Sequence, residues 1–358
     1  MVIRSSGEDA YFAASNSAKG FFSYYPACFD SARVKRLYAV KGGPGTGKSR
    51  FLREVARSGE GNGWLCEYIY CSSDADSLDG IILTKGENCI ALLDATAPHV
   101  YEPTRPGVRE ELINLGVFWD GELLASRAEE VEKLTAQKSA AYRRAYRYLC
   151  GVGEMSETAD ELVSPYIRRE AIAAFAQKLL GEVEAEQSFS MTPALIRSVG
   201  MRGMVGFDTY FAQAKKIVLL SDCHGSASVL MEALGRIASQ KKLAVRISHD
   251  PICPEKIDGL FFIKSGLSVA VCREEECNYP HKTVSMRRFV STAKMNPIRD
   301  ELNYAKRLRR ALLDGAIEAL EEVRSVHFLI EEIYSSAMNF TAKETFTEIF
   351  CRELFQST

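Results

Sequence analysis

This 358-residue sequence has little excess of either charge and no long apolar segment. The formal net charge is −2, so bulk electrostatic attraction to nucleic acid is not expected. No apolar run approaches the roughly 20 residues that a membrane-spanning helix needs, so membrane association is not expected either. The N-terminal residues lack the continuous apolar core and the small-residue cleavage site of a secretion signal. These absences predict a cytoplasmic protein.

A framework of disulfides or metal ions is not indicated, although the sequence contains ten cysteines. No two cysteines form a C-x-x-C pair, and most stand in apolar, strand-like segments, which favours buried free thiols. Cys272, Cys277 and His281 could approach a metal, but no fourth ligand follows at the spacing of a zinc finger. A zinc site is therefore not expected.

One strong motif is present. Residues 41–50, KGGPGTGKSR, fit the phosphate-loop (P-loop, Walker A) pattern G-x-x-x-x-G-K-[ST]. Residues 36–40, RLYAV, precede the motif and are rich in strand formers. After it, Phe51, Leu52 and Val55 recur at helical spacing, and a glycine-rich segment ends the predicted helix. The motif thus stands in the strand–loop–helix context that a phosphate-binding loop needs.

The chemistry of this motif predicts binding of ATP with Mg²⁺. Its glycines let the backbone curl so that several N–H groups point at phosphate oxygens, and the following helix adds its positive N-terminal dipole. Lys48 is expected to reach the β- and γ-phosphates, and Ser49 is expected to ligate Mg²⁺. The residues predicted to bind the nucleotide are Gly42, Gly43, Pro44, Gly45, Thr46, Gly47, Lys48, Ser49 and Arg50.

A P-loop site also needs an acid at the end of a neighbouring strand. Residues 89–93 form an apolar, strand-like run, and Asp94 ends it, so Asp94 is predicted to hold Mg²⁺ through water. The alternative is an aspartate that caps the next turn. No Glu follows Asp94, so the water-activating glutamate of one large class of ATPases is missing from its usual place. The hydrolytic base is therefore unassigned.

Further candidates follow the predicted strand at residues 66–70. In an open α/β sheet the carboxyl end of a strand faces the ligand, so Asp74 could orient a water or an acceptor hydroxyl. Capping and solvation of a short helix is the alternative for Asp74, and it is favoured for Asp76 and Asp79. His99, Arg105 and Arg109 follow Asp94 in the chain, and an arginine near the γ-phosphate would stabilise transferred charge. Surface positions are the favoured interpretation of these three residues.

The second half of the chain repeats the first at an offset of about 179 residues. Residues 219–234, LLSDCHGSASVLMEAL, align with the P-loop and its helix, and Asp258-Gly259 align with Asp79-Gly80. The copy has a shorter loop, with Ser226 in place of Gly47 and Ala227 in place of Lys48. By the same offset, Arg273 replaces Asp94. The copy is therefore predicted to be a pseudo-domain without Mg-nucleotide, and a site for another anion at Gly225, Ser226 and Ser228 is the alternative.

The predicted fold is α/β, with two tandem P-loop NTPase-like domains. Each is expected to have a mainly parallel sheet flanked by helices and a C-terminal helical segment. The polar segment 181–193 marks the boundary, which places an active domain at residues 1–182 and a pseudo-domain at residues 183–358. In the helical segments, Arg143 and Arg147 share one face, as do Lys306 and Arg310. Such residues could form a lid over phosphates, but a solvated face is the favoured interpretation.

Several stretches of the chain resemble a group of bacterial tandem P-loop proteins that are described as ATP-binding proteins, predicted ATPases or predicted nucleotide kinases. These stretches are AYFAASNSAKGFFSYY, LYAVKGGPGTGKSRFL, CSSDADSLDGIIL and LLDATAPHVYEP. The resemblance covers nearly the whole chain and is densest over its first third. Both halves of that family often carry a phosphate loop and an APH after the acid, and the second half of this chain departs from both features, at Ala227 and Arg273.

Three functions are compatible with these features. The preferred one is ATP hydrolysis that drives a change between the two halves or acts with a partner, with Lys48, Asp94 and Asp74 as the candidate catalytic residues. The second is phosphoryl transfer to a small molecule or nucleotide. The third is a nucleotide-dependent interaction module with slow turnover, which would bind a protein partner or self-associate.

Overall fold

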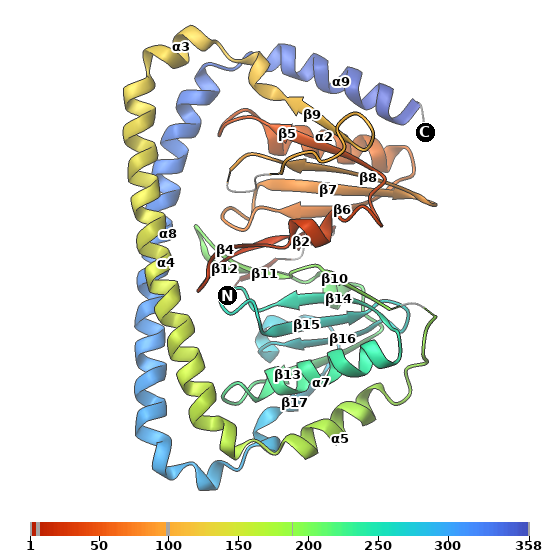
Figure 1. The fold of residues 1–358 in the computed structure, drawn as a ribbon, viewed down its shortest axis with the longest axis vertical. Coiled ribbons are helices and arrows are strands. Elements are labelled where there is room, and N and C mark those ends of the chain that lie inside the picture. The colour runs from red at the N-terminus through yellow and green to blue at the C-terminus, as the bar shows by residue number, and fades with distance from the viewer. Residues whose placement is uncertain (1, 5–7, 98–100, 188, 357–358) are drawn as a thin grey trace.

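The structure is a computed structural model that describes residues 2–4, 8–97, 101–187 and 189–356. Two six-stranded sheets lie one above the other, and two long helices run along one side of both (Figure 1). We call the upper sheet with its covering helices the first lobe and the lower sheet with its covering helices the second lobe. No helix in these described ranges is long and apolar enough to cross a membrane.

The first sheet has the strand order β2-β6-β7-β8-β5-β9. Its strand β7 is antiparallel to both neighbours, and the other strands are parallel to one another. The strands are β2 (Asp9–Phe12), β5 (Arg36–Lys41), β6 (Leu65–Tyr70), β7 (Leu78–Lys85), β8 (Asn88–Asp94) and β9 (Glu110–Asn114). The mixed sheet of mostly parallel strands confirms the predicted α/β class.

The second sheet repeats this pattern with the order β10-β14-β15-β16-β13-β17, in which β15 is the antiparallel strand. Its strands are β10 (Ser190–Pro193), β13 (Lys216–Ser221), β14 (Ala244–His249), β15 (Ile257–Phe262), β16 (Leu267–Val271) and β17 (Lys282–Ser285). Strand for strand the order matches the first sheet, as a tandem duplication requires.

Smaller elements and a shared core join the two sheets. Strands β1 (Val2–Arg4), β12 (Gly203–Phe207) and β11 (Arg197–Gly200) form a small sheet, and β3 (Ala14–Ser17) pairs with β4 (Gly20–Ser23). The short helices α1 (Tyr25–Cys28) and α6 (Thr209–Ala212) lie between the sheets. Buried side chains of both lobes meet there, among them Leu37, Ala39, Ile69, Leu219, Phe261 and Ala270. The lobes are also linked by backbone, since the Phe12 and Leu195 N–H groups each donate to the other's carbonyl.

One helix in each lobe follows the equivalent central strand. Helix α2 (Lys48–Gly61) follows β5 and buries Phe51, Leu52 and Val55 against the first sheet. Helix α7 (Ser226–Gln240) follows β13 and buries Leu230, Met231 and Leu234 against the second. Apolar residues at the same spacing therefore pack each helix against its own sheet. The remaining short helices are η1 (Leu115–Phe118), α3 (Gly121–Ser126), η2 (Ser164–Tyr166), η3 (Glu274–Glu276), η4 (Met286–Phe289), η5 (Thr292–Lys294) and η6 (Asn296–Ile298).

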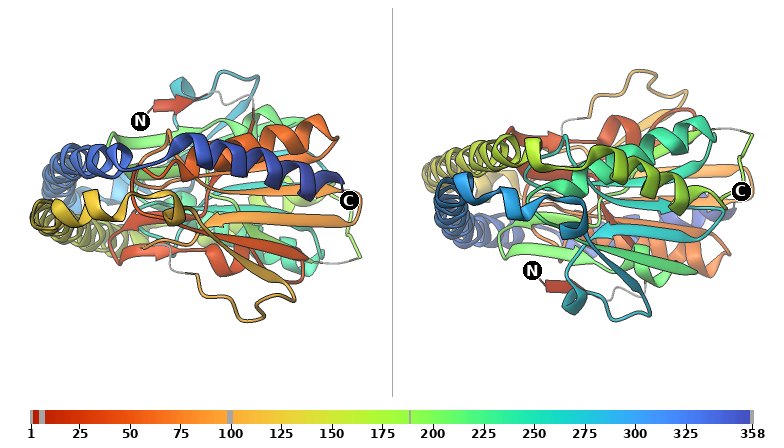
Figure 2. Two further views of the ribbon diagram at one scale, coloured as in Figure 1. Left: turned by 90° about the horizontal axis from the view of Figure 1, so that it is seen from above. Right: turned by 90° about the horizontal axis from the view of Figure 1, so that it is seen from below.

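The terminal helices are exchanged between the lobes, which the sequence did not predict. Helix α4 (Ala128–Val163) leaves the first lobe and descends antiparallel to α8 (Arg299–Ser336), so that α5 (Arg169–Leu180) packs on α7 of the second lobe. Helix α8 rises in return, and α9 (Phe340–Gln356) packs on α2 of the first lobe. Figure 2 shows α9 beside α2 from above and α5 beside α7 from below. Each sheet is therefore covered by a helix from the other half of the chain.

The exchange predicts how a divided chain behaves. Residues 183–358 alone lack α5, whose Ile172, Ala176 and Leu180 are fully buried in the second lobe. Loss of three such side chains removes apolar burial of about 1.5–3 kcal/mol for each large one, a large share of the stability of a domain. We expect the fragment 183–358 to show no cooperative thermal unfolding alone and to copurify with the fragment 1–182 when both are expressed together. The exchange would be contradicted if either fragment alone unfolded cooperatively with the same melting temperature as the intact chain.

Candidate functional site

Residues 42–47, which we call the first loop, connect the end of β5 to the start of α2. Gly45 and Gly47 have φ values of +71° and +75°, a backbone region that glycine adopts without strain. Gly47 is the N-cap of α2 and carries no capping side chain. The backbone N–H groups at the start of α2 are thus left for another acceptor, which is the local structure of an anion site.

Lys48 and Asp94 are brought together inside this loop. The Lys48 ammonium donates hydrogen bonds of 2.8 Å to the carbonyl oxygens of Gly42 and Gly43, and its Nζ lies 3.5 Å from Oδ2 of Asp94. The two side chains are only 11% and 13% exposed. The predicted loop lysine and strand-end acid are therefore neighbours in a partly dry environment, where charges interact strongly.

The environment of Asp94 raises the pKa of its carboxyl above the ordinary value. Burial raises the pKa of the Asp94 carboxyl, and the nearby Asp79 raises it further, while Lys48 and a 2.8 Å hydrogen bond from the Thr96 N–H lower it. The Thr96 hydroxyl donates to the Gly42 carbonyl, which ties the end of β8 to the first loop. A divalent cation at Asp94 would add to the positive charge of Lys48 and stabilise the carboxylate further.

The other predicted site residues have local partners. The Ser49 hydroxyl accepts a hydrogen bond of 2.9 Å from the Leu78 N–H, so one of its lone pairs is engaged. The Asp74 carboxylate accepts the Asp76 N–H in a turn after β6, and residues 71–77 form turns and bends in place of the short helix of the capping alternative. Arg50 is exposed and pairs with Glu54 on α2 and with Glu344 on α9. Arg50 thus joins the exchanged helix α9 to the start of α2.

Arg109 lies at the amino end of the sheet, away from the first loop. Its buried guanidinium donates to the carbonyls of Phe29 and Val34 and pairs with Glu110 at 2.7 Å. The surface position expected for Arg109 is wrong, because these partners hold it inside the fold. Arg105 donates its backbone N–H to Glu110, and His99 lies outside the described residues.

Sequence reasoning missed the residues that α8 brings to the first loop. The Ser335 hydroxyl donates to the Gly45 carbonyl at 3.2 Å. A Cβ added at Gly45 would lie 2.5 Å from the Glu331 carbonyl oxygen, and one at Gly43 would lie 3.2 Å from the Tyr334 ring. These contacts leave no room for side chains on the outer surface of the loop. The end of α8 therefore rests directly on the loop backbone.

Lys343 of α9 is a second missed residue. Its side chain is completely buried, and its Nζ has no hydrogen-bond partner among the described residues. The nearest carboxylate oxygen is Oε2 of Glu54 at 3.7 Å, and a Cβ added at Gly47 would lie 3.9 Å from Nζ. A buried ammonium without hydrogen bonds costs free energy, and its position beside Gly47 adds positive charge at the start of α2.

Residues 222–225 form the equivalent loop of the second lobe, which we call the second loop. The side chain of its own residue Asp222 fills this loop. The Asp222 carboxylate accepts hydrogen bonds of 2.9 Å from the Gly225 N–H and 2.8 Å from the Ala227 N–H. These two N–H groups lie at the start of α7. The equivalent N–H groups at the start of α2 have no such cap. Gly225, with φ +78°, rather than Ser226, has the conformation of Gly47. The anion position at this helix start is thus occupied by a carboxylate of the chain itself.

Strand register corrects the expected replacement of Asp94 by Arg273. In the first sheet Gly80 pairs with Leu93, and in the second Gly259 pairs with Ala270. Since Gly80 and Gly259 are equivalent, the residue that follows Ala270 is equivalent to Asp94. That residue is Val271, because the β15–β16 hairpin is shorter than the β7–β8 hairpin. Arg273 lies farther along and is exposed, so the carboxylate of Asp94 is replaced by an apolar side chain and not by a cation.

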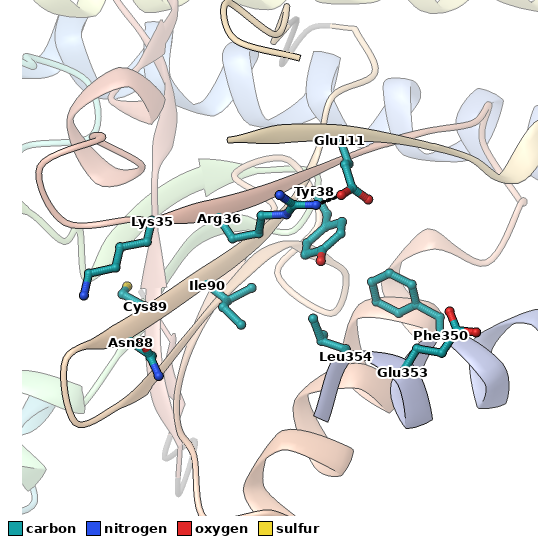
Figure 3. Close-up of a pocket in the computed structure, with 10 residues that line it drawn as sticks. All are labelled: Lys35, Arg36, Tyr38, Asn88, Cys89, Ile90, Glu111, Phe350, Glu353 and Leu354. Atoms are coloured by element: carbon teal, nitrogen blue, oxygen red, sulfur yellow. Dashed lines mark ion pairs between the residues drawn. The ribbon is translucent and has the colours of Figure 1, made fainter. Parts of the chain in front are cut away.

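A hollow of about 480 Å³ lies at the opposite end of the first sheet (Figure 3). It is lined by the starts of β5 and β8 and by the end of α9, among them Lys35, Arg36, Asn88, Phe350 and Leu354. Ligands of open α/β sheets bind at the carboxyl ends of the strands, where the first loop is. We therefore regard the loop, and not this hollow, as the candidate site.

Comparisons of the chain with protein-family models, with curated proteins and with solved structures found no match.

The contact between α8 and the first loop can be tested at Gly45. We expect Gly45→Ala to lower the free energy of unfolding by about 2 kcal/mol or more, because alanine is strained at φ +71° and its Cβ would meet the Glu331 carbonyl. Gly61→Ala, at an open position at the end of α2, is the control and should be neutral or stabilising. Urea unfolding measures both variants. Equal stability of the two would show that α8 does not rest on the loop.

The raised pKa of Asp94 gives a prediction for the nucleotide-free protein. Because burial disfavours the carboxylate, we expect Asp94→Asn to raise the melting temperature at pH 7. The folded wild type gains stability as the pH falls and Asp94 binds a proton, so the advantage of the variant should shrink on acidification. Asp314→Asn, at an exposed position on α8, is the control. A lower melting temperature of Asp94→Asn at pH 7 would mean that the Lys48 contact outweighs the cost of burial.

Proposed function

We propose that the first lobe binds Mg-ATP in the first loop and hydrolyses it, with one nucleotide site per chain. The observation that carries this proposal is the position of Lys48, whose ammonium is held on the Gly42 and Gly43 carbonyls next to Asp94. A flexible cation folded back on its own loop can exchange these carbonyls for phosphate oxygens with little movement. The resemblance to tandem P-loop ATP-binding proteins agrees with this assignment.

The residues around the first loop fit a nucleotide with its metal. The uncapped N–H groups at the start of α2 and the ammonium of Lys48 suit the β- and γ-phosphates. The second lone pair of the Ser49 hydroxyl and the Asp94 carboxylate suit Mg²⁺, which neutralises phosphate charge when bound. The buried Lys343 ammonium, which has no hydrogen-bond partner in the described part of the chain, adds to the same positive field.

The second lobe supports the first without a nucleotide of its own. Its loop donors are satisfied by Asp222, and its Asp94 equivalent is Val271. Because Gly225 corresponds to Gly47, the residue in the place of Lys48 is the buried Ser226, and not Ala227 as the sequence offset predicted. Its role in this proposal is mechanical, because its helix α8 ends on the first loop. A nucleotide that shifts the loop would act on α8 and so on the α4–α8 pair.

Slow turnover is the expected behaviour of the isolated protein. The residue after Asp94 is the buried Ala95, so no glutamate activates water from that position, and Asp74 is engaged in its turn. A partner that supplies a base or a cation would accelerate the reaction, by a factor of roughly 10³–10⁵ in systems with a delivered arginine. The interaction-module function therefore stays as the second candidate.

The first test is nucleotide binding and γ-phosphate release from Mg-ATP. We expect Lys48→Ala to weaken ATP binding at least tenfold, about 1.4 kcal/mol, and to abolish release while the melting temperature stays close to wild type. Lys35→Ala, at the opposite end of β5, is the charge-matched control and should behave as wild type. Equilibrium titration should give one ATP per chain. Two nucleotides per chain, or unchanged binding by Lys48→Ala, would refute the proposal.

A further inference from the structure

A cationic pocket lies in the second lobe beside the second loop. It has a volume of about 540 Å³ and is formed by Cys223 and His224 of that loop, by Arg287 of η4, by the segment around η5 and η6, and by the first two turns of α8. Both the loop and η4 follow the carboxyl ends of strands, β13 and β17. The pocket thus lies at the edge of the second sheet where α/β proteins bind ligands.

The side chains that line this pocket carry positive charge and no negative charge. Arg287, Arg299 and Lys306 line it, and no Asp or Glu does. In the described part of the chain, Arg287 and Lys306 form no ion pair, and Arg299 donates a hydrogen bond of 2.5 Å to the neutral amide oxygen of Asn296. Three exposed cations from two separate elements thus line one pocket, although side chains of like charge repel one another, and the closest carboxylate of the loop, that of Asp222, is engaged by the Gly225 and Ala227 N–H groups.

The loop beside the pocket agrees with a ligand site. His224 has φ +57°, one of two non-glycine residues of the described ranges in the left-handed region, which costs free energy. Burial and the positive charges of Lys306 and Arg287 lower the pKa of His224, while Asp222 raises it. The imidazole is therefore held neutral, so it can donate or accept a hydrogen bond without adding charge.

A ligand of this pocket would be bound by side-chain cations, whereas a nucleotide in the first loop would also be bound by backbone N–H groups. Asp222 already caps the start of α7, so the backbone N–H groups there are not free for phosphate. The donors that remain are guanidinium and ammonium groups of Arg287, Arg299 and Lys306, which bind phosphate by charge and by forked hydrogen bonds. The residues that line the pocket include the buried Leu302 and Met295, which can pack against an organic group of the ligand.

We propose that the second lobe binds a small phosphorylated molecule in this pocket through Arg287, Arg299 and Lys306, without a divalent cation. The site is independent of ATP binding by the first lobe, and it does not use the backbone donors of the second loop.

The probe is inorganic pyrophosphate, titrated calorimetrically into the full chain in the presence of EDTA. The Lys48→Ala background removes binding at the first loop, so a signal that remains belongs to another site. We expect binding that Arg287→Gln/Lys306→Gln weakens at least tenfold. Lys294→Gln/Arg307→Gln removes the same charge from exposed residues that do not line the pocket and should change the affinity less than twofold.

Three results would overturn the site. They are no detectable binding of pyrophosphate in the Lys48→Ala background, equal affinity in the Arg287→Gln/Lys306→Gln variant, and an equal loss in both double variants, which would indicate diffuse surface charge. The melting temperature of each variant is measured alongside. If the double variant is unfolded, Lys306→Gln alone replaces it with an expected loss of severalfold. A failure of ATP binding at the first loop would leave this result unchanged.

Discussion

The antiparallel packing of α4 against α8 is the contact on which the rest of the molecule depends. Ala145, Leu149 and Val152 of α4 share a buried cluster with Ala316 and Leu320 of α8. The alanines Ala145 and Ala316 leave room for the larger side chains of Leu149, Val152 and Leu320 between the two helices. Because each helix begins at one lobe and ends at the other, this packing places α5 on the second sheet and α9 on the first. The two sheets are therefore joined through their covering helices as well as through the core between them.

The two lobes share one backbone arrangement but differ in the charged groups at the start of the helix that follows the loop. In the first lobe the helix after the loop begins without a cap. Lys48 and Asp94 form an ion pair beside it, and the buried Nζ of Lys343 has no hydrogen-bond partner among the described residues. In the second lobe the carboxylate of Asp222 caps the equivalent helix, and apolar Val271 takes the place of the buried acid. A loop that satisfies its own donors is more stable alone and has less to gain from a ligand.

Local features of the fold and site could be predicted from the sequence, and long-range ones could not. The strand–loop–helix around Lys48, the strand that ends at Asp94 and the internal repeat follow from periodicity and motif spacing. The exchange of helices could not be predicted, because the apolar face of Ile172, Ala176 and Leu180 suits either sheet. The equivalence of Val271 and Asp94 was hidden, since a constant sequence offset does not reveal a shortened hairpin. Lys343 is far from the loop in sequence and belongs to no motif.

The exchange of helices has a consequence for how such a chain can evolve. Two identical half-length chains that swapped these helices would form a closed two-fold pair, and joining them end to end yields the present arrangement. After the fusion, chemistry in one loop can decay while its half is still required, because the other loop is covered by α8 and α9 of that half. Natural selection on a single catalytic loop would then preserve both halves. Structural dependence of this kind would let the second half persist even if its own loop bound no nucleotide.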